Sequence, residues 1–319
     1  MIGDLIADEF IYGRVARVSR EAPVLILQYD STQIVPGGAG NAANNVASLG
    51  GRTHIVGLTG KDEAGKRLHA SLAHVNTRGL LSPRGYCTPV KTRILAGGVH
   101  TAKQQIVRID RVVSSECDQS ARAAFVRAAM KAAADCDAIL MSDYGTGLVT
   151  TELASALGTT GRTRGRSVPI LIDSRYDLLT YRGLTACTPN ESEVEHLFDT
   201  KIGDNVKALE RAGRELLKRT RMNAVLITRG SRGMAVFEPD RPTVHVPIYG
   251  SDEVADVTGA GDTVIATMTL AIAAGASFDE SARLANYAAG LVVMKRGTAT
   301  VTPEELREAI RSDAATRNE

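Results

Sequence analysis

The sequence predicts an α/β fold built around a buried, mostly parallel β-sheet. From about residue 37 onward, short apolar runs alternate with segments of helical pattern. The apolar runs are continuous, which is typical of strands that helices cover on both faces. Two other segments, at about 8–36 and 90–113, alternate polar and apolar residues, which indicates exposed antiparallel strands. We therefore expect a main parallel sheet with a smaller sheet beside it.

The elements of the main sheet follow one another along the chain. The first strand is expected to be very short, because residues 1–4 already resemble the end of a strand. Continuous apolar runs predict strands at 54–57, 138–141, 168–173 and 224–228. Helical patterns separate them at 40–49, 119–134 and 205–220, and an Ala-rich helix is expected from about residue 260.

The segments at 8–36 and 90–113 are similar in kind although they are far apart in sequence. They could form one small sheet over the strand ends, where it would act as a lid and exclude water from a reacting group. Two ordinary surface hairpins explain the same pattern equally well. Residues 1–319 contain no low-complexity linker and no internal repeat, so a single domain carrying this lid is expected.

Composition excludes several classes of function. The net charge is +2, so no overall field favours binding to nucleic acid or to a membrane. No apolar run is long enough to span a bilayer, and the N-terminus lacks a signal-peptide pattern. The four cysteines form no C-x-x-C pair and fit no zinc module, so reduced thiols in a cytoplasmic protein are expected.

Two glycine-rich strings partly match nucleotide-binding motifs. Residues 60–66 fit G-x-x-x-x-G-K, but Arg67 stands where a Walker loop needs Ser or Thr for magnesium. Residues 38–43 fit G-x-G-x-x-A, but the next predicted strand does not end in an acidic residue. A Walker loop is therefore not expected, and a dinucleotide oxidoreductase is only a weak alternative.

The most informative string is Asp256-Val-Thr-Gly-Ala-Gly-Asp262-Thr. Its glycines precede a helix, where unpaired backbone N–H groups and the helix dipole attract anions. Gly259, Ala260 and Gly261 could thus form an anion hole, and Asp262 could take a proton from an attacking hydroxyl. Both are required for phosphoryl transfer to an alcohol. Taken alone, Asp262 could equally be a helix cap.

A second glycine-rich string suggests a polyol site. Gly37 and Gly38 precede a predicted helix, so a ligand could approach the backbone there. Asn41 can donate to and accept from hydroxyl groups. Asp4 and Asp8 lie near the first strand, and each carboxylate can accept from neighbouring hydroxyls. A capped helix with surface acids is the alternative for any one of these residues.

Polar residues after two later strands suggest a nucleotide site. Asn190 and Glu193 stand three apart at a helix start and could hold water-bound magnesium beside phosphates. Thr228, Gly230 and Gly233 end another strand and suit contact with a nucleotide phosphate or ribose. A helix cap and a plain β-turn are the respective alternatives.

Arginine side chains offer a site for an anionic group on the substrate. The guanidinium group matches phosphate in a forked geometry. The candidates in this sequence are Arg93, Arg108 and Arg175. A solvated surface residue is the alternative for any one of them.

Together these motifs resemble the ribokinase-like, or PfkB, carbohydrate kinases. Residues 37–41 are similar to that family's N-terminal signature and residues 256–262 to its C-terminal one. The resemblance implies a three-layer α/β/α fold with a small β-sheet lid. It is strongest to the branch that phosphorylates D-glycero-β-D-manno-heptose 7-phosphate for lipopolysaccharide synthesis. The strings that carry this likeness are residues 3–8, 17–24, 91–93, 104–110, 142–145 and 181–183.

The resemblance implies a role for each motif. Asp262 would be the base, with the anion hole at Gly259, Ala260 and Gly261. The sugar phosphate would be bound by Asp4, Asp8, Gly37, Gly38, Asn41, Arg93 and Arg108. The nucleotide would be bound by Asn190, Glu193, Thr228, Gly230, Gly233 and Asn286, with Asn286 completing the adenine pocket. ATP and Mg²⁺ are implied, with Glu193 serving magnesium through water, and a requirement for a monovalent cation stays open. The exposed lid strands would pair two copies into a homodimer.

Three features depart from the family pattern. Heptose kinases usually have Asp-Pro-Lys-Gly where this chain has Asp173-Ser174-Arg175-Tyr176, and residues 96–103 are extra length. The H-x-G-H string of the nucleotidyltransferase domain found in bifunctional relatives is absent, so kinase activity alone is expected. Another sugar, sugar-acid or nucleoside kinase is the first alternative. A regulator that binds a nucleotide or sugar without catalysis is the second.

Overall fold

The computed structural model describes residues 1–97, 103–111, 118–163, 168–250, 256–295 and 297–316. Most of the extra length at 96–103 and the end of the predicted lid segment, residues 112 and 113, lie outside these ranges, as does Cys117. Cys87 and Cys187 have free thiols. None of the described helices is long and apolar enough to cross a membrane.

Within the described residues, nine strands form the main sheet, in the order β13-β12-β11-β10-β9-β8-β1-β4-β5. All neighbouring pairs are parallel except β11 with β12 and β12 with β13, which are antiparallel. The bounds are β1 (Ile2–Gly3), β4 (His54–Leu58), β5 (Asn76–Leu81), β8 (Ile139–Asp143), β9 (Ile170–Ser174), β10 (Ala186–Cys187), β11 (Ala224–Thr228), β12 (Met234–Phe237) and β13 (Val244–Val246).

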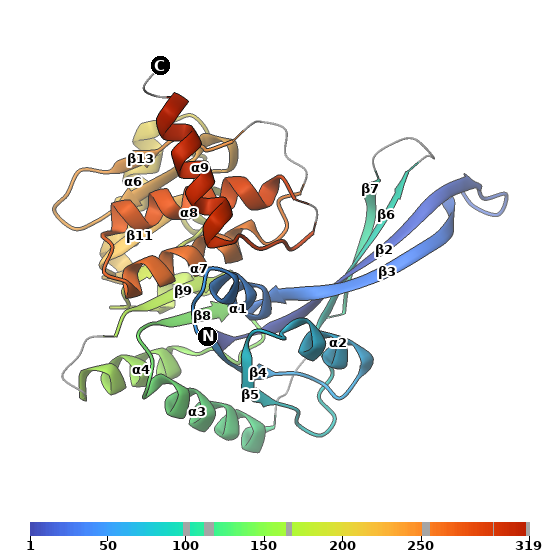
Figure 1. Ribbon diagram of the computed structural model, residues 1–319, viewed down its shortest axis with the longest axis horizontal. Coiled ribbons are helices and arrows are strands. Elements are labelled where there is room, and N and C mark those ends of the chain that lie inside the picture. The colour runs from blue at the N-terminus through green and yellow to red at the C-terminus, as the bar shows by residue number, and fades with distance from the viewer. Residues whose placement is uncertain (98–102, 112–117, 164–167, 251–255, 296, 317–319) are drawn as a thin grey trace.

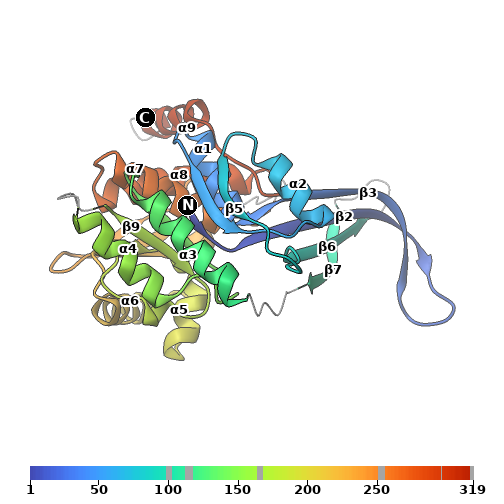
Figure 2. The same ribbon diagram turned by 90° about the horizontal axis from the view of Figure 1, so that it is seen from below.

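Helices cover both faces of this sheet, as Figure 2 shows with α7 and α8 on one side and α3, α4 and α6 on the other. The α-helices are α1 (Ala39–Ser48), α2 (Glu63–Ser71), α3 (Gln119–Ala133), α4 (Thr151–Thr163), α5 (Glu191–Phe198), α6 (Val206–Thr220), α7 (Ala260–Ala273), α8 (Phe278–Val293) and α9 (Pro303–Thr316). Two short 3₁₀ helices span Leu178–Thr180 and Gly230–Arg232.

The buried strands explain why the apolar runs are continuous. In β11, Val225 and Ile227 join the core under α3, α4 and α6, whereas Ala224 and Leu226 join the core under α7 and α8. Successive side chains of a strand point to opposite faces, so a strand covered on both faces needs apolar residues at every position. The predicted three-layer α/β/α fold is confirmed.

A four-stranded sheet stands beside the main body, in the order β3-β2-β6-β7. Its strands are β2 (Leu5–Val18), β3 (Leu25–Gly38), β6 (Val90–Gly97) and β7 (Gln104–Arg111). The two predicted segments therefore pair, β2 with β6 in parallel, as one sheet rather than two separate hairpins. Figure 1 shows this lid sheet projecting from the body, with β2 and β3 as a long ribbon. Every residue of its outer strand β7 is exposed.

Packing of α6 against the sheet yields a stability prediction. A Cβ at Gly213 would lie 2.3–2.5 Å from ring atoms of the buried Phe237. Gly213→Ala should therefore lower the free energy of unfolding by roughly 1–3 kcal/mol, although alanine is the better helix former. Apart from its own helix backbone, no atom of the described residues lies within 4 Å of a Cβ at Gly158 in α4, so Gly158→Ala should instead stabilise by up to about 1 kcal/mol. Urea unfolding followed by circular dichroism measures both.

Candidate active site

A cleft lies where the lid sheet meets the carboxyl ends of the main strands, the position at which open α/β sheets bind ligands. Its empty volume is about 450 Å³. The loops after β8 and β9, the base of the lid and the start of α7 all contribute to its wall. The lining residues are Ile6, Asp8, Gly38, Lys91, Arg93, Tyr144, Arg175, Thr258, Gly259 and Asp262.

Asp262 is buried in the wall of this cleft, in the first turn of α7. One carboxylate oxygen accepts from Asn41 Nδ2 at 2.9 Å, and the other accepts from the Tyr144 hydroxyl at 3.3 Å. The pKa of Asp262 is raised to about 7, mainly by burial and also by the charge of Asp8. The hydrogen bonds from Asn41 and Tyr144 and the charge of Lys91 limit the rise. A carboxylate with such a pKa can accept a proton at neutral pH.

The turn before Asp262 presents unpaired backbone donors. Gly259 adopts a left-handed conformation with φ of 81°, and a Cβ there would lie 2.4 Å from Asn41 Nδ2. Among the described residues, the N–H groups of Gly259, Gly261 and Asp262 have no acceptor. The N–H of Ala260 donates to the Val257 carbonyl at 3.2 Å, so Ala260 is not part of the predicted anion hole. The remaining donors stand at the positive end of α7.

Three cationic side chains face the same cleft. Arg93 forms an ion pair with Asp8, and its guanidinium group stacks over Phe10. Lys91 Nζ lies 4.7 Å from the centroid of the Tyr144 ring, and burial, together with the charge of Arg175, lowers the pKa of Lys91. Neither Lys91 nor Arg175 has a carboxylate within 4.0 Å in the described ranges. The cleft is therefore suited to an anionic ligand.

Not every predicted sugar-binding residue reaches the cleft. Asp4 lies behind it, where its carboxylate accepts from the backbone N–H of Tyr144 at 2.8 Å and from the Thr146 hydroxyl. Burial raises the pKa of Asp4 to about 6. Asn41 is also buried, with its amide directed at Asp262 and at the Gly259 carbonyl. In this structure Asp4 therefore holds the loop after β8, and Asn41 holds the carboxylate of Asp262.

Gly37, Gly38 and Arg108 occupy different places around the cleft. Gly38 lines it, whereas Gly37 lies against Asp8, whose carboxylate would overlap a Cβ at that position. Arg108 does not line the cleft. It belongs to the exposed outer strand β7, and its guanidinium group pairs with Asp110 at 2.9 Å.

The predicted magnesium residues form a helix cap. Asn190 Oδ1 accepts from the Glu193 N–H, and Glu193 Oε2 accepts from the Asn190 N–H, both at 2.9 Å. Burial raises the pKa of Glu193. Asp173 at the end of β9 has its pKa raised by burial and then by the charges of Asp262 and Glu193. The pKa of Asp173 is thus influenced both by Asp262 in the cleft and by Glu193 at the helix start.

The glycine turn after β11 adjoins this helix start. Asn190 forms an isolated parallel bridge with Thr228, so the two predicted nucleotide segments are neighbours. Gly230 and Gly233 have positive φ angles of 56° and 75°. Glu191 fixes the turn, because its two carboxylate oxygens accept from Arg229 Nε at 2.7 Å and from Arg232. The turn is thereby held rigidly beside α5.

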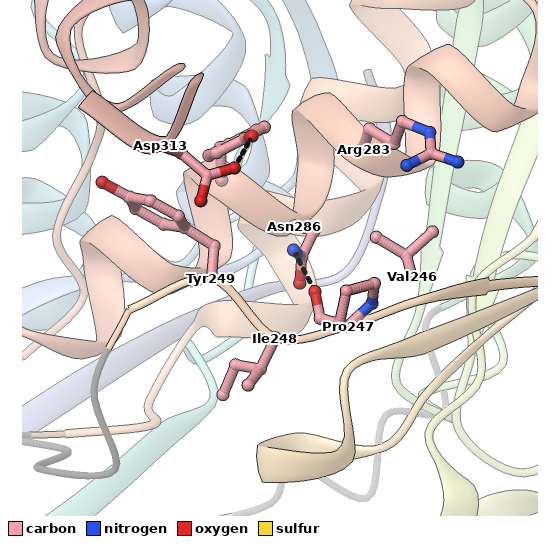
Figure 3. A pocket seen from close by; sticks show the side chains of 8 residues that line it. Val246, Pro247, Ile248, Tyr249, Arg283, Asn286 and Asp313 are labelled. Carbon is pink, nitrogen blue, oxygen red and sulfur yellow. Dashed lines mark hydrogen bonds between the residues drawn. The ribbon is translucent and has the colours of Figure 1, made fainter. Parts of the chain in front are cut away.

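Asn286 lies in a second, smaller pocket between α8 and the segment that follows β13. Figure 3 shows its side chain directed at the Pro247 carbonyl, to which Nδ2 donates at 2.8 Å. Tyr249, Arg283 and Asp313 surround it. A Cβ at Gly233 would lie within 3 Å of the Val246 carbonyl and the Ile248 nitrogen, so this pocket adjoins the glycine turn. The predicted nucleotide residues consequently lie one beside the next, from Asn190 and Thr228 through Gly233 to Asn286.

Over residues 5–305 the sequence matches the family described as pfkB family carbohydrate kinase. The chain belongs to this family. It is 40% identical over 310 residues to "Bifunctional protein HldE" of Desulfatibacillum aliphaticivorans, covering 96% of this chain and 62% of that protein. The chain therefore spans less than two thirds of the length of this curated relative.

Solved structures confirm the ribokinase-like fold. Ribokinase of Arabidopsis thaliana, in complex with ribose and ATP, superposes with a TM-score of 0.73 at 21% identity, covering 97% of each chain. Phosphofructokinase-2 of Escherichia coli, in complex with potassium, has a TM-score of 0.76 at 17% identity and covers 98% of each. Family membership places the chain among enzymes that transfer phosphate to carbohydrates.

Four residues of this pfkB-family site were given no specific role by the sequence prediction, namely Lys91, Tyr144, Asp173 and Glu191. Tyr144 and Asp173 could have been found from their positions, because Asp173 ends the predicted strand at 168–173 and Tyr144 lies three residues after the predicted strand at 138–141, and the ends of parallel strands converge. Lys91 lies in an alternating segment that gave no indication of which face meets the cleft. In the described part of the chain, no group of three or more His, Cys, Asp or Glu side chains could hold a metal ion.

Proposed function

We propose that this chain transfers the γ-phosphoryl group of ATP to the anomeric hydroxyl of D-glycero-β-D-manno-heptose 7-phosphate. The observation that carries the proposal is the meeting of three features in one cleft. These are a buried carboxylate with a pKa of about 7, unpaired N–H groups at a helix start, and several cations. The sequence likeness to the heptose 7-phosphate branch supports this acceptor among sugars.

In this proposal Asp262 removes the proton of the acceptor hydroxyl as the hydroxyl oxygen bonds to the γ-phosphorus of ATP. The bond from that phosphorus to the oxygen bridging the β- and γ-phosphates breaks, and ADP leaves. The N–H groups of Gly259, Gly261 and Asp262 donate to the transferred group, where negative charge must be stabilised. Asn41 and Tyr144 hold the carboxylate in place through their hydrogen bonds. The lid sheet closes one side of the cleft and limits access of water.

The nucleotide is assigned to the row from Asn190 through Thr228 and Gly233 to Asn286. Glu193 and Asp173 support a magnesium ion nearby, because burial raises the pKa of both carboxyl groups and the charge of Glu193 raises the pKa of Asp173 further. A divalent cation would relieve that repulsion and neutralise phosphate charge. ATP as the donor also fits a cytoplasmic location, which belongs to the same proposal.

The acceptor's own phosphate is assigned to the cations near the lid. Lys91 and Arg93 project from β6, on the side of the cleft formed by the lid, and Arg175 faces them from the loop after β9. Lys91 and Arg175 have no carboxylate partner within 4.0 Å in the described ranges, and the phosphate of a phosphorylated sugar would supply a negatively charged partner for both.

An acceptor panel tests the proposed function. ADP release should be measured with ATP and Mg²⁺ in the presence of heptose 7-phosphate, other sugar phosphates, unphosphorylated sugars, sugar acids and nucleosides. Heptose 7-phosphate should give the highest kcat/KM. A higher kcat/KM for an unphosphorylated sugar or a nucleoside would replace the proposed acceptor. If no acceptor in the panel gave ADP release, a regulator without catalysis would be favoured.

We also infer a homodimer formed through the lid. Large apolar side chains are exposed on its strands and connecting segment, namely Val15, Val18, Val24, Leu25, Tyr29, Ile106, Val107 and Ile109. Burying such a patch against a second copy would remove it from water. Light scattering should therefore give twice the chain mass of 33.9 kDa, and Val107→Glu should shift the protein toward the monomer. A wild-type monomer at micromolar concentration would contradict this inference.

A further inference from the structure

Tyr144 contacts the proposed base directly, although neither the motifs nor the comparisons assign it a role. It follows β8, and its hydroxyl donates to Asp262 Oδ1 at 3.3 Å. The other oxygen of Asp262 accepts from Asn41, which belongs to α1. Each carboxylate oxygen is therefore held by one donor, and the two donors come from separate parts of the fold.

The ring of Tyr144 is fixed on two sides. A Cβ at Gly38 would lie 3.2 Å from the ring and 2.7 Å from the Asp4 carbonyl oxygen, so the ring packs closely against the Gly38 backbone. Lys91 Nζ lies 4.7 Å from the ring centroid on the cleft side. These contacts set the direction in which the hydroxyl points.

The loop that carries Tyr144 is held by two buried carboxylates. Asp4 accepts from the backbone N–H of Tyr144 and from the Thr146 hydroxyl. Asp143 accepts from the backbone N–H of Gly145 at 3.0 Å and from the Tyr181 hydroxyl at 2.8 Å. Burying carboxylates costs free energy, so their use here indicates that the position of this loop matters.

The hydroxyl of Tyr144 acts as the donor in its contact with Asp262. Burial and the negative charge of Asp262 raise the pKa of Tyr144 well above 10, so the hydroxyl keeps its proton. A donor of this kind stabilises the ionised carboxylate more than the protonated one. The charged or titratable groups that influence Asp262 are Asp8 from β2, Lys91 from β6, Asp173 from β9 and Tyr144 itself.

We propose that Tyr144 is a positioning residue that orients Asp262 into the cleft and favours its ionised form through the hydroxyl. This inference rests on the proposed function, because it assigns Tyr144 to the base of that reaction. It adds the expectation that the loop after β8, which Asp4 and Asp143 hold in place, presents the Tyr144 hydroxyl to the base.

Tyr144→Phe removes the hydroxyl and keeps the ring that packs on Gly38. The pKa of Asp262 should then rise from about 7 by about one unit, since a hydrogen bond to a charged group contributes that order of stabilisation. Asp262 would be ionised only at higher pH. The acidic limb of the kcat/KM profile, which reports the free enzyme, should shift upward by the same amount, with a roughly tenfold loss below the wild-type midpoint.

The direct test is a pH titration of protein labelled with ¹³C at the aspartate carboxyl carbon. Comparison with Asp262→Asn identifies the Asp262 resonance. Its midpoint should rise in Tyr144→Phe and stay unchanged in Tyr176→Phe, the matched control, because Tyr176 is 65% exposed and packs on the neighbouring Gly145. An unchanged midpoint in Tyr144→Phe, or an equal rise in the control, would overturn the proposal.

A second variant keeps the test valid if Tyr144→Phe does not fold. Replacement of Tyr144 by 3-fluorotyrosine makes the hydroxyl a stronger donor and should lower the Asp262 midpoint. A midpoint that stays the same or rises would overturn the proposal. The titration needs no substrate, so an enzyme without sugar kinase activity would refute the proposed function and leave the Tyr144 contact testable on its own.

Discussion

Asp262→Asn should remove nearly all phosphoryl transfer while ATP binding is retained. Asparagine cannot accept the hydroxyl proton, and general-base catalysis contributes roughly 10²–10⁴-fold to the rate. The substitution keeps the size of the side chain, so the N–H groups of Gly259 and Gly261 should stay in place. We expect kcat to fall by about 1000-fold, with the dissociation constant for ATP within about threefold of wild type. A coupled ADP assay and titration calorimetry measure the two quantities.

A matched charge change far from the cleft serves as the control. Glu304 is exposed on α9 and pairs only with its helix neighbour Arg307 among the described residues. Glu304→Gln should leave kcat within about twofold of wild type, because surface pairs of this kind contribute little. If Asp262→Asn retained more than about a tenth of wild-type kcat, Asp262 would not be the base.

Lys91→Met should discriminate between phosphorylated and unphosphorylated acceptors. The Lys91 ammonium group faces the cleft from the lid and has no carboxylate within 4.0 Å in the described ranges. If it binds the acceptor's phosphate, its loss removes a partly buried charge pair, which costs about 2–5 kcal/mol. We expect kcat/KM for heptose 7-phosphate to fall by about 100-fold or more, mainly through KM.

The same variant should change kcat/KM for an unphosphorylated sugar, and KM for ATP, by only a fewfold. Lys207→Met, on the exposed side of α6, removes the same charge and should have no effect. An equal loss with phosphorylated and unphosphorylated acceptors would mean that Lys91 acts on the transferred group or on the lid. The acceptor phosphate would then have to be assigned elsewhere.

Local strings were sufficient to predict where the proposed base lies. The Gly-Ala-Gly-Asp turn and the Ala-rich run after it determine where α7 begins, and Asp262 stands in the first turn of that helix. Continuous apolar runs likewise located β4, β8, β9 and β11, because strands buried on both faces allow few polar residues. These features depend on neighbours in sequence, which a single sequence displays directly.

The partners of Asp4 and Asn41 could not be predicted in this way. Asp4 bonds to Tyr144 and Thr146, and Asn41 bonds to Asp262, all more than 100 positions away in sequence. Only the crossover order of the main sheet brings these segments together. The sequence therefore predicted polar residues suited to a sugar, and the structure shows that these two hold other parts of the site.

The sequence also could not predict which of the two lid arginines, Arg93 and Arg108, faces the cleft. Arg93 and Arg108 are register partners on β6 and β7, yet only Arg93 lines the cleft. The outer position of β7 and the nearby Asp110 direct Arg108 to solvent. Ala260 is similar, because whether its N–H is free depends on the turn at Val257. Such outcomes follow from sheet order and turn geometry, which alternation of residue type does not specify.

Phosphorus-31 NMR of one reaction mixture tests the central claim most directly. The mixture contains the chain, ATP, Mg²⁺ and D-glycero-β-D-manno-heptose 7-phosphate. The account predicts a new resonance of a phosphate coupled to the anomeric proton, which grows as the γ-phosphate signal of ATP falls, while the 7-phosphate signal persists. An unchanged γ-phosphate signal, or conversion of ATP to free inorganic phosphate alone, would contradict it.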